Sequence, residues 1–388
     1  MNSSAAHSFD QADPDAPHIP AGVDPAELAV TSQRAELARR LLDILALPAG
    51  QVNENERAFT GDMLNELLDF VPDVLKIEVA QRLSSVLTPP IALLRRLILE
   101  HIDVAGFLLR ELKDIPDCLL VEAARVGPAH RDIIVRRLKI TDMVAEALLE
   151  AEDVPISQMV LARSEVTLAE TRIDRLLQMS IDYPSLREPL LHRLELQPRH
   201  GFTMFWWVNA VERRKIFSRF AIDRGIIQNS LKQLFIEVFP DPDPDLVVKR
   251  VLTLCDRRHR PRGSNGEAVA MDMVIKMLTA ARANPTPERC AATGLLAGVS
   301  PDTATRVLYD RGGEPFAILC KSIGISRSAF ADVMVKSRLM RKDDAAGPAF
   351  DEEKAEHLMA SFDMIARDYA RTVLRYWDWR RETYSSAH

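Results

Sequence analysis

Apolar residues recur along this chain at the spacing of a helix face, and no long stretch alternates as a strand would. From Gln33 onward one face carries Leu37, Leu41, Leu42 and Leu45, and the run ends at Pro48-Ala49-Gly50. A second helical run extends over 59–70 and stops before Pro72. The pattern predicts an all-α protein.

One short phrase returns between residues 79 and 194. Its copies are VAQRL, LLREL, IVRRL, VLARS and LLHRL, which end at Leu83, Leu112, Leu138, Ser164 and Leu194 at spacings of 29, 26, 26 and 30 residues. Apolar residues four apart, such as Ile134 with Leu138 and Leu190 with Leu194, predict a buried stripe on each helix. Because one helix cannot bury its stripe alone, adjacent helix pairs are expected to stack into an α-solenoid.

Breaks in the pattern predict six segments. Residues 1–31 are acidic and poor in large apolar side chains, which predicts a disordered tail. The segments that follow are a solenoid over 32–239 with an aromatic cap, a linker with a basic loop over 240–266, a smaller helical module over 267–341, a linker over 342–350 and a long amphipathic C-terminal helix over 351–384.

The predicted module at 267–341 contains one short motif twice, 26 residues apart, as Gly298-Val-Ser300 and Gly324-Ile-Ser326. Glycine ends helices and serine begins them, so each copy predicts a helix-turn-helix corner. The last helix carries apolar residues at spacings of 4, 3, 4, 4 and 3, which is typical of a packed or self-associating helix. These residues are Leu358, Phe362, Ile365, Tyr369, Val373 and Tyr376.

Composition narrows the class of protein. The 388 residues are 47% hydrophobic, which is ample for a core. Of the net charge of −6, five acidic residues precede Arg34 without a Lys or Arg, so the rest is near neutral, unlike a dedicated nucleic-acid binder. The four cysteines are scattered and predict buried small side chains in a reducing compartment. With neither a signal peptide nor a membrane span expected, we predict a cytoplasmic protein.

Three segments together resemble a known family: the short helix-pair repeats, FWWVNAVERRKIFSRF, and LLAGVSPDTATRVLYDRGGEPFAILCKSIGISRSAF. They are similar to the alphaproteobacterial family of HEAT-like repeats that is catalogued only as a domain of unknown function. The similarity runs from about residue 70 to 380, and its clearest markers are Trp206-Trp207 and the turn Tyr309-Asp-Arg-Gly-Gly313. It implies a HEAT-like helical-repeat fold in a bacterial cytosol, and no catalytic residues.

Four arginines stand one residue before the end of their repeat phrases: Arg82, Arg137, Arg163 and Arg193. Stacked repeats would bring them into a row that could bind carboxylates or phosphates. The structural interpretation, which we favour, is that each arginine flanks its apolar stripe and binds helix C-terminal carbonyls or a neighbouring acid.

Aromatic residues mark two further candidate partner sites. Trp206 and Trp207 are interpreted as part of a cap that closes the end of the solenoid. In the last helix Tyr376, Trp377 and Trp379 lie among arginines, a composition enriched in interfaces, so a homodimer or a protein partner could use this helix. The alternative is that the helix packs back on its own module.

The basic loop carries Arg257, Arg258, Arg260 and Arg262. It could bind a phosphate, a nucleic-acid backbone or an acidic partner, or it could be a solvated loop without a role. We leave these alternatives open.

No nucleotide-binding, zinc-protease or nucleophile-elbow motif is present, so neither a catalytic residue, a cofactor nor a metal is expected. The sequence predicts a non-catalytic scaffold or adaptor that binds protein partners. The alternative is a nucleic-acid-binding transcriptional regulator that uses the corners within residues 290–341, although its second helices offer few basic residues beyond Arg306, Arg327 and Lys336. A sensor with a small ligand between repeats is a third hypothesis.

Overall fold

A computed structural model describes residues 25–48, 51–86, 88–220, 259–337 and 351–379. All regular elements in these ranges are helices, apart from one isolated bridge between Arg262 and Ala268, so the all-α prediction is confirmed. The chain divides into two compact units, which we call unit 1 (Met1–Val160) and unit 2 (Leu161–His388). This division falls inside the predicted solenoid of 32–239, and not in the linker predicted at 240–266.

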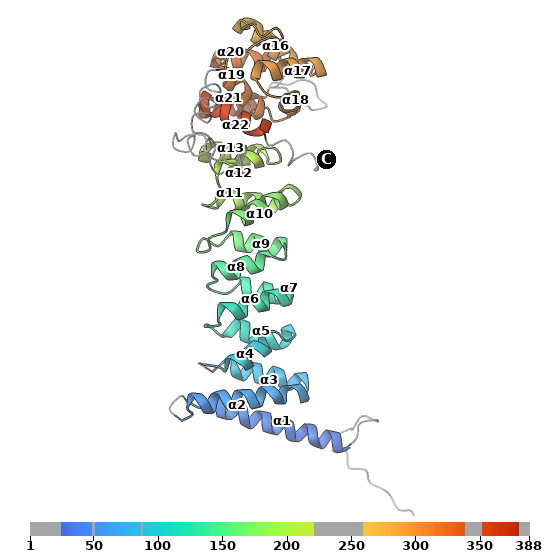
Figure 1. The fold of residues 1–388 in the computed structure, drawn as a ribbon, viewed down its shortest axis with the longest axis vertical. Helices are drawn as coiled ribbons and strands as arrows, with labels where there is room; N and C mark the ends of the chain where they lie inside the picture. Colours follow the sequence, from blue (N-terminus) through green and yellow to red (C-terminus); the bar gives the residue numbers. More distant parts are fainter. Residues whose placement is uncertain (1–24, 49–50, 87, 221–258, 338–350, 380–388) are drawn as a thin grey trace, which may run out of the picture. The chain divides into compact units, whose positions relative to one another are not determined.

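Unit 1 is a succession of short helices in which each helix packs against the next but one: α1 with α3, α2 with α4, and so on to α6 with α8 (Figure 1). Prolines stand before or at the first turn of several of these helices, where a missing N–H costs nothing. The helices are α1 (Pro25–Leu45), α2 (Glu54–Leu67), η1 (Leu68–Phe70), α3 (Asp73–Leu83), α4 (Ile91–Ile98), α5 (Ile102–Glu111), α6 (Asp117–Val126), α7 (Pro128–Val135), α8 (Asp142–Leu149) and α9 (Val154–Leu161), whose last residue belongs to unit 2.

Unit 2 is built around one central helix, α19, on which α17, α18, α21 and α22 pack. Residues 315–320 of this helix are all apolar, and nine of its ten residues are buried. The helices of unit 2 are α10 (Glu170–Asp182), η2 (Pro184–Leu186), α11 (Arg187–His192), α12 (Pro198–Met204), α13 (Ala210–Phe220), α16 (Met271–Ala283), α17 (Pro287–Ala297), α18 (Pro301–Tyr309), α19 (Glu314–Ile323), α20 (Arg327–Lys336), α21 (Glu352–Met364) and α22 (Arg367–Trp379).

The repeat phrases bury most of their apolar residues, but two predictions were wrong. Leu83 and Leu112 are buried, whereas Leu138 and Leu194 are each 92% exposed. Both exposed leucines come after their helices have ended, since α7 stops at Val135 and α11 at His192. The apolar stripe therefore does not continue to them.

The C-terminal segment is two helices and not the single helix predicted over 351–384. The chain leaves helical geometry at Ile365, whose backbone is extended, and α22 begins at Arg367. The six apolar residues predicted to pack, from Leu358 to Tyr376, are nevertheless all buried on both sides of this break.

The cysteine prediction holds only in part. Cys290 and Cys320 are buried, whereas Cys118 is exposed on the solvent side of α6. Cys255 lies outside the described residues, as do residues 1–24 of the tail predicted over 1–31 and the linker predicted over 342–350. Helix α1 begins at Pro25, inside the predicted tail.

Candidate partner-binding site

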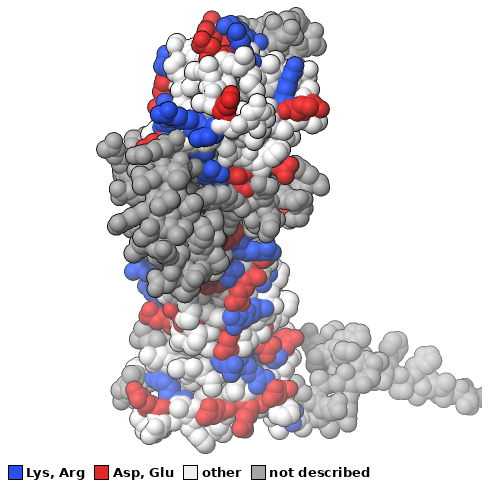
Figure 2. Space-filling model, turned by 45° about the horizontal axis from the view of Figure 1, so that its top comes forward, with Lys and Arg blue, Asp and Glu red and all other residues white. Residues whose placement is uncertain are grey.

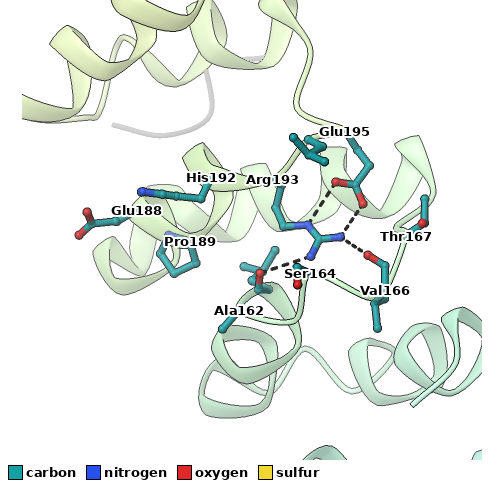
Figure 3. A pocket seen from close by; sticks show the side chains of 11 residues that line it. Ala162, Ser164, Val166, Thr167, Glu188, Pro189, His192, Arg193 and Glu195 are labelled. Atoms are coloured by element: carbon teal, nitrogen blue, oxygen red, sulfur yellow. Dashed lines mark hydrogen bonds and ion pairs between the residues drawn. The ribbon is translucent and has the colours of Figure 1, made fainter. Parts of the chain in front are cut away.

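Arg193 lies just after α11 and joins this helix to the segment that follows α9. Its guanidinium donates a hydrogen bond to the carbonyl of Arg163 at 2.6 Å. It also donates to the carbonyl of Val166 (Figure 3). Carbonyls at and beyond a helix C-terminus have no partner within the helix, so an arginine from the next repeat satisfies them. Only 5% of Arg193 is exposed, and Glu195 balances its charge.

Glu195 also fixes the loop on the other side of Arg193. Its carboxylate accepts a hydrogen bond from the Leu168 backbone N–H at 3.0 Å. Burial opposes its ionisation, but the hydrogen bonds from Arg193 and from the backbone, together with the charge of Arg193, outweigh burial and lower the pKa of Glu195. Arg193 and Glu195 thus hold the 162–168 loop against the end of α11.

A pocket of about 600 Å³ opens beside this pair. Figure 3 shows Glu188, Pro189 and His192 on one side of it and Val166 and Thr167 on the other. Most of the remaining wall is apolar, and it includes the exposed side chain of Leu194. Because the arginine is fully engaged with the protein, the open part of the pocket offers mainly apolar surface with a polar rim.

The other predicted arginines do not form a row of free guanidinium groups. Arg137 donates to the carbonyls of Leu112 and Lys113, both at 2.8 Å. It thus binds the carbonyls of the preceding repeat in the same way as Arg193, which stands two repeat phrases later. Arg82 is paired with Asp43, and Arg163 with Glu165 at 2.6 Å. These are the contacts that the structural interpretation predicts.

Sequence reasoning missed one further member of this series. Arg219 in α13 donates to the carbonyls of Leu191 at 2.7 Å and Arg193 at 2.6 Å, at the end of α11. It follows Arg193 by 26 residues, the same interval as between two of the predicted arginines, so the spacing was a usable signal.

The aromatic segment does not close an open end, because α22 covers it. Trp377 donates its indole N–H to the carbonyl of Phe202 at 2.7 Å, and the Tyr376 hydroxyl lies 2.7 Å from that of Thr203. The rings of Trp206 and Trp377 have centroids 4.6 Å apart. The cap interpretation was therefore wrong.

These contacts also decide where the aromatic candidates lie. Tyr376 and Trp377 are buried within unit 2, so a homodimer through them would require them to leave this core. Trp206 and Trp207 are half-buried, and the indole of Trp207 donates to the Ser180 hydroxyl at 3.0 Å. The side chain of Trp379 lies outside the described residues.

A buried ionic cluster, which sequence reasoning also missed, joins α13 to α19 and α21. Arg213 contacts both oxygens of Asp310, at 2.8 and 3.1 Å, and Glu314 at 2.6 Å. His357 lies 2.8 Å from the other oxygen of Glu314. Burial opposes ionisation of Glu314, but the hydrogen bond with His357 and the charge of Arg213 outweigh it and lower its pKa to about 2.

The cluster explains the marker turn at 309–313. A Cβ on Gly312 would lie 2.2 Å from Glu314 Oε2 and 2.4 Å from Arg213 Nη1, so only glycine fits beside this ion pair. The Gly313 N–H donates to Asp310 at 2.8 Å and closes the turn. Pairing over about 100 residues of sequence leaves no local pattern, which is why the sequence did not reveal it.

The two predicted corners have the expected local geometry. α17 and α19 end at Gly298 and Gly324, both with positive φ, and the following serines cap α18 and α20. The start of α18 is occupied by the chain itself, because Asp378 accepts hydrogen bonds from the Ser300 N–H at 2.8 Å and from the Thr303 hydroxyl at 3.0 Å.

Basic residues at the corners also have partners. Arg306 stacks 4.0 Å above the ring of Trp206, Arg327 is paired with Asp363 at 2.9 Å, and Lys336 lies 3.9 Å from Asp332. On the face shown in Figure 2, Lys and Arg are interspersed with Asp and Glu. Neither observation indicates a continuous basic surface in the part of the chain on view.

Only half of the basic loop is described. Arg260 is exposed, and Arg262 donates to the carbonyl of Gly266 at 3.0 Å within a small turn. Arg257 and Arg258 lie outside the described residues.

Over the described ranges, no helix is both long and apolar enough to cross a membrane, and no group of three or more His, Cys, Asp or Glu is placed to hold a metal ion.

Fold and site together define a class: an all-helical protein in which arginines from one helical hairpin bind the carbonyl ends of another. The family model of uncharacterised proteins conserved in bacteria (DUF2336) matches residues 104–375, which is more than half of the chain. The chain belongs to this bacterial family. No curated protein and no solved structure matches it.

Proposed function

We propose that this chain is a non-catalytic scaffold or adaptor that binds protein partners in the bacterial cytoplasm. Its helices would be HEAT-like pairs stacked as a solenoid, and the packing of each helix in unit 1 on the next but one supports this. The partner would bind at the pocket between the 162–168 loop and α11.

The observation that carries this proposal is Leu194, a large apolar side chain that is 92% exposed at the rim of an apolar pocket. A single exposed leucine is ordinary on a protein surface. A leucine beside a pocket with rigid walls, however, can contact an apolar side chain of a partner that enters the pocket. The ion pair between the buried Arg193 and the partly buried Glu195 would provide that rigidity. A fitting partner is a short extended protein segment that inserts an apolar side chain.

The alternative is a nucleic-acid-binding regulator that uses residues 290–341. This alternative has less support, because Arg306, Arg327 and Lys336 already contact Trp206, Asp363 and Asp332. Contacts to phosphates need cations that are available to bind them. A small-ligand sensor would use the same pocket and would show saturable binding without a protein.

The test is an affinity capture from nuclease-treated bacterial cytosol with the full chain and with Leu194→Asp. We expect specific proteins that the wild type retains and Leu194→Asp loses. Leu138→Asp is the matched control, because Leu138 is equally exposed and ends an equivalent repeat phrase but does not line this pocket.

Two results would contradict the proposal. Partners that Leu194→Asp and the wild type retain equally would place binding elsewhere. Recovery of nucleic acid alone when nuclease is omitted would favour the regulator.

A further inference from the structure

The first helical hairpin of unit 1 exposes two apolar stripes. On α1 the stripe repeats every seven residues, and on α2 and η1 it follows spacings of four and seven, as in packed helix bundles. Its members are between 39% and 66% exposed: Val30, Leu37, Ile44, Phe59, Met63 and Phe70. So many large apolar side chains close together are unusual on the surface of a monomer.

The two stripes lie next to each other because α1 and α2 run antiparallel. At one end of the hairpin, the guanidinium of Arg34 lies 4.9 Å from the ring centroid of Phe70. At the other end, Arg57 donates to the carbonyl of Leu45 at 3.0 Å. These contacts set the register of the hairpin.

Both stripes face away from the rest of unit 1. The opposite flank of α1 is bound to α3, where Arg39 pairs with Glu78 at 3.2 Å. The opposite flank of α2 is bound to α4, where Arg96 donates to the carbonyl of Asn65 at 2.6 Å. Figure 1 shows α1 and α2 at the end of the helices of unit 1, with no described helix beyond them.

We propose that this face binds the same face of a second copy of the chain, with α1 of each copy on α2 of the other. The register of the hairpin places Arg40 of α1 level with Asp62 of α2, and both side chains are exposed at the outer edges of their stripes. Within α1, Arg40 also forms an exposed ion pair with Glu36 at 3.2 Å, which leaves its other guanidinium nitrogens for a second carboxylate. A two-fold axis parallel to the helices then brings Arg40 of each copy to Asp62 of the other. The resulting four-helix arrangement pairs apolar with apolar and basic with acidic residues.

The size of the face suits a dimer of modest affinity. A helix of 21 residues is roughly 30 Å long and two adjacent helices are roughly 20 Å wide, so each copy offers on the order of 600 Å². Two such faces bury about 1,200 Å², at the lower end of the range for specific complexes. A dissociation constant in the micromolar range is expected.

The experiment is sedimentation velocity on the full chain at concentrations up to about 100 µM, where a dimer with a micromolar Kd is nearly complete. The wild type should dimerise. Leu37→Glu with Ile44→Glu should weaken dimerisation by about a hundredfold or more, because it buries four unpaired carboxylates in each dimer. The matched control is Val126→Glu with Leu138→Glu, two exposed apolar residues elsewhere in unit 1, which should leave the dimer unchanged.

A charge exchange gives a second test that does not disturb the apolar stripes. Arg40→Glu or Asp62→Arg alone should weaken the dimer by about tenfold or less, since exposed ion pairs are weak, and the two together should restore it. A wild type that stays monomeric at the highest concentration would overturn the proposal. So would a dimer that neither the stripe variant nor the charge variants weaken.

Discussion

The two units use arginine in different ways. In unit 1, several arginines link a helix to the next but one through exposed ion pairs, such as Arg125 of α6 with Glu150 at the end of α8, in which both side chains are about half exposed. Arg137 is an exception, because it binds backbone carbonyls. In unit 2, arginines enter the core, where Arg213 lies between two buried carboxylates and Arg193 binds backbone carbonyls. An exposed pair is screened by water and contributes little, whereas a buried charge depends on every one of its partners. We therefore expect substitution of the buried arginines Arg213 and Arg193 to be costly, and substitution of an exposed, ion-paired arginine such as Arg125 to be nearly neutral.

The chain offers a direct way to measure the two units separately. All four tryptophans belong to unit 2, so tryptophan fluorescence reports its unfolding in the full chain, while far-UV circular dichroism reports both units.

The largest effect is expected for Arg213→Ala, which leaves Asp310 and Glu314 buried without their cation. It should destabilise unit 2 by about 3–5 kcal/mol. Urea unfolding followed by tryptophan fluorescence measures this loss. Arg213→Lys keeps the charge but cannot contact both oxygens of Asp310, so its loss should be smaller. Equal stability of Arg213→Ala and the wild type would show that the cluster does not hold unit 2 together.

Acid should act on the same cluster. The pKa of Glu314 is lowered from 4.5 to about 2, so its ionised form stabilises the fold above pH 4.5, and this contribution is lost as the pH falls toward 2. The shift corresponds to on the order of 3 kcal/mol. Asp174 titrates in the same range, because the hydrogen bonds from His200 and Arg199 outweigh its burial and lower its pKa to about 2.

The effect of Glu314 is therefore measured as the difference in pH dependence of the urea midpoint between the wild type and Glu314→Gln. The urea midpoint of unit 2 should fall less steeply with acid in Glu314→Gln than in the wild type. Identical slopes would assign the acid sensitivity to other carboxylates.

The smallest losses of stability are expected for substitutions of Arg193 and Arg125. Arg193→Ala leaves buried carbonyls without donors and should cost unit 2 about 1–3 kcal/mol, seen by fluorescence. Arg125→Ala is its matched control in unit 1 and should cost less than about 1 kcal/mol, seen by circular dichroism. If the two losses are equal, burial does not distinguish the arginines of the two units.

Local patterns in the sequence determined the helical class and several of the helix ends. The corners at Gly298 and Gly324, the caps at Ser300 and Ser326, and the all-helical class all follow from interactions within a few residues, which periodicity and capping preferences report. The helical C-terminal carbonyl contacts of Arg137 could be predicted for the same reason, because they recur at the interval of the repeat.

Only the tertiary structure decided which faces are covered. Leu138 and Leu194 belong to apolar phrases yet are exposed, because their helices end before them. Arg213 and Asp310 are 97 residues apart, and Tyr376 meets Thr203 across 173 residues. Such pairs leave no periodic trace in one sequence, since the free energy that joins them comes from burial and from charges brought together by packing. The sequence thus determined the helices, and long-range packing determined the cluster, the pocket and the faces left open to partners.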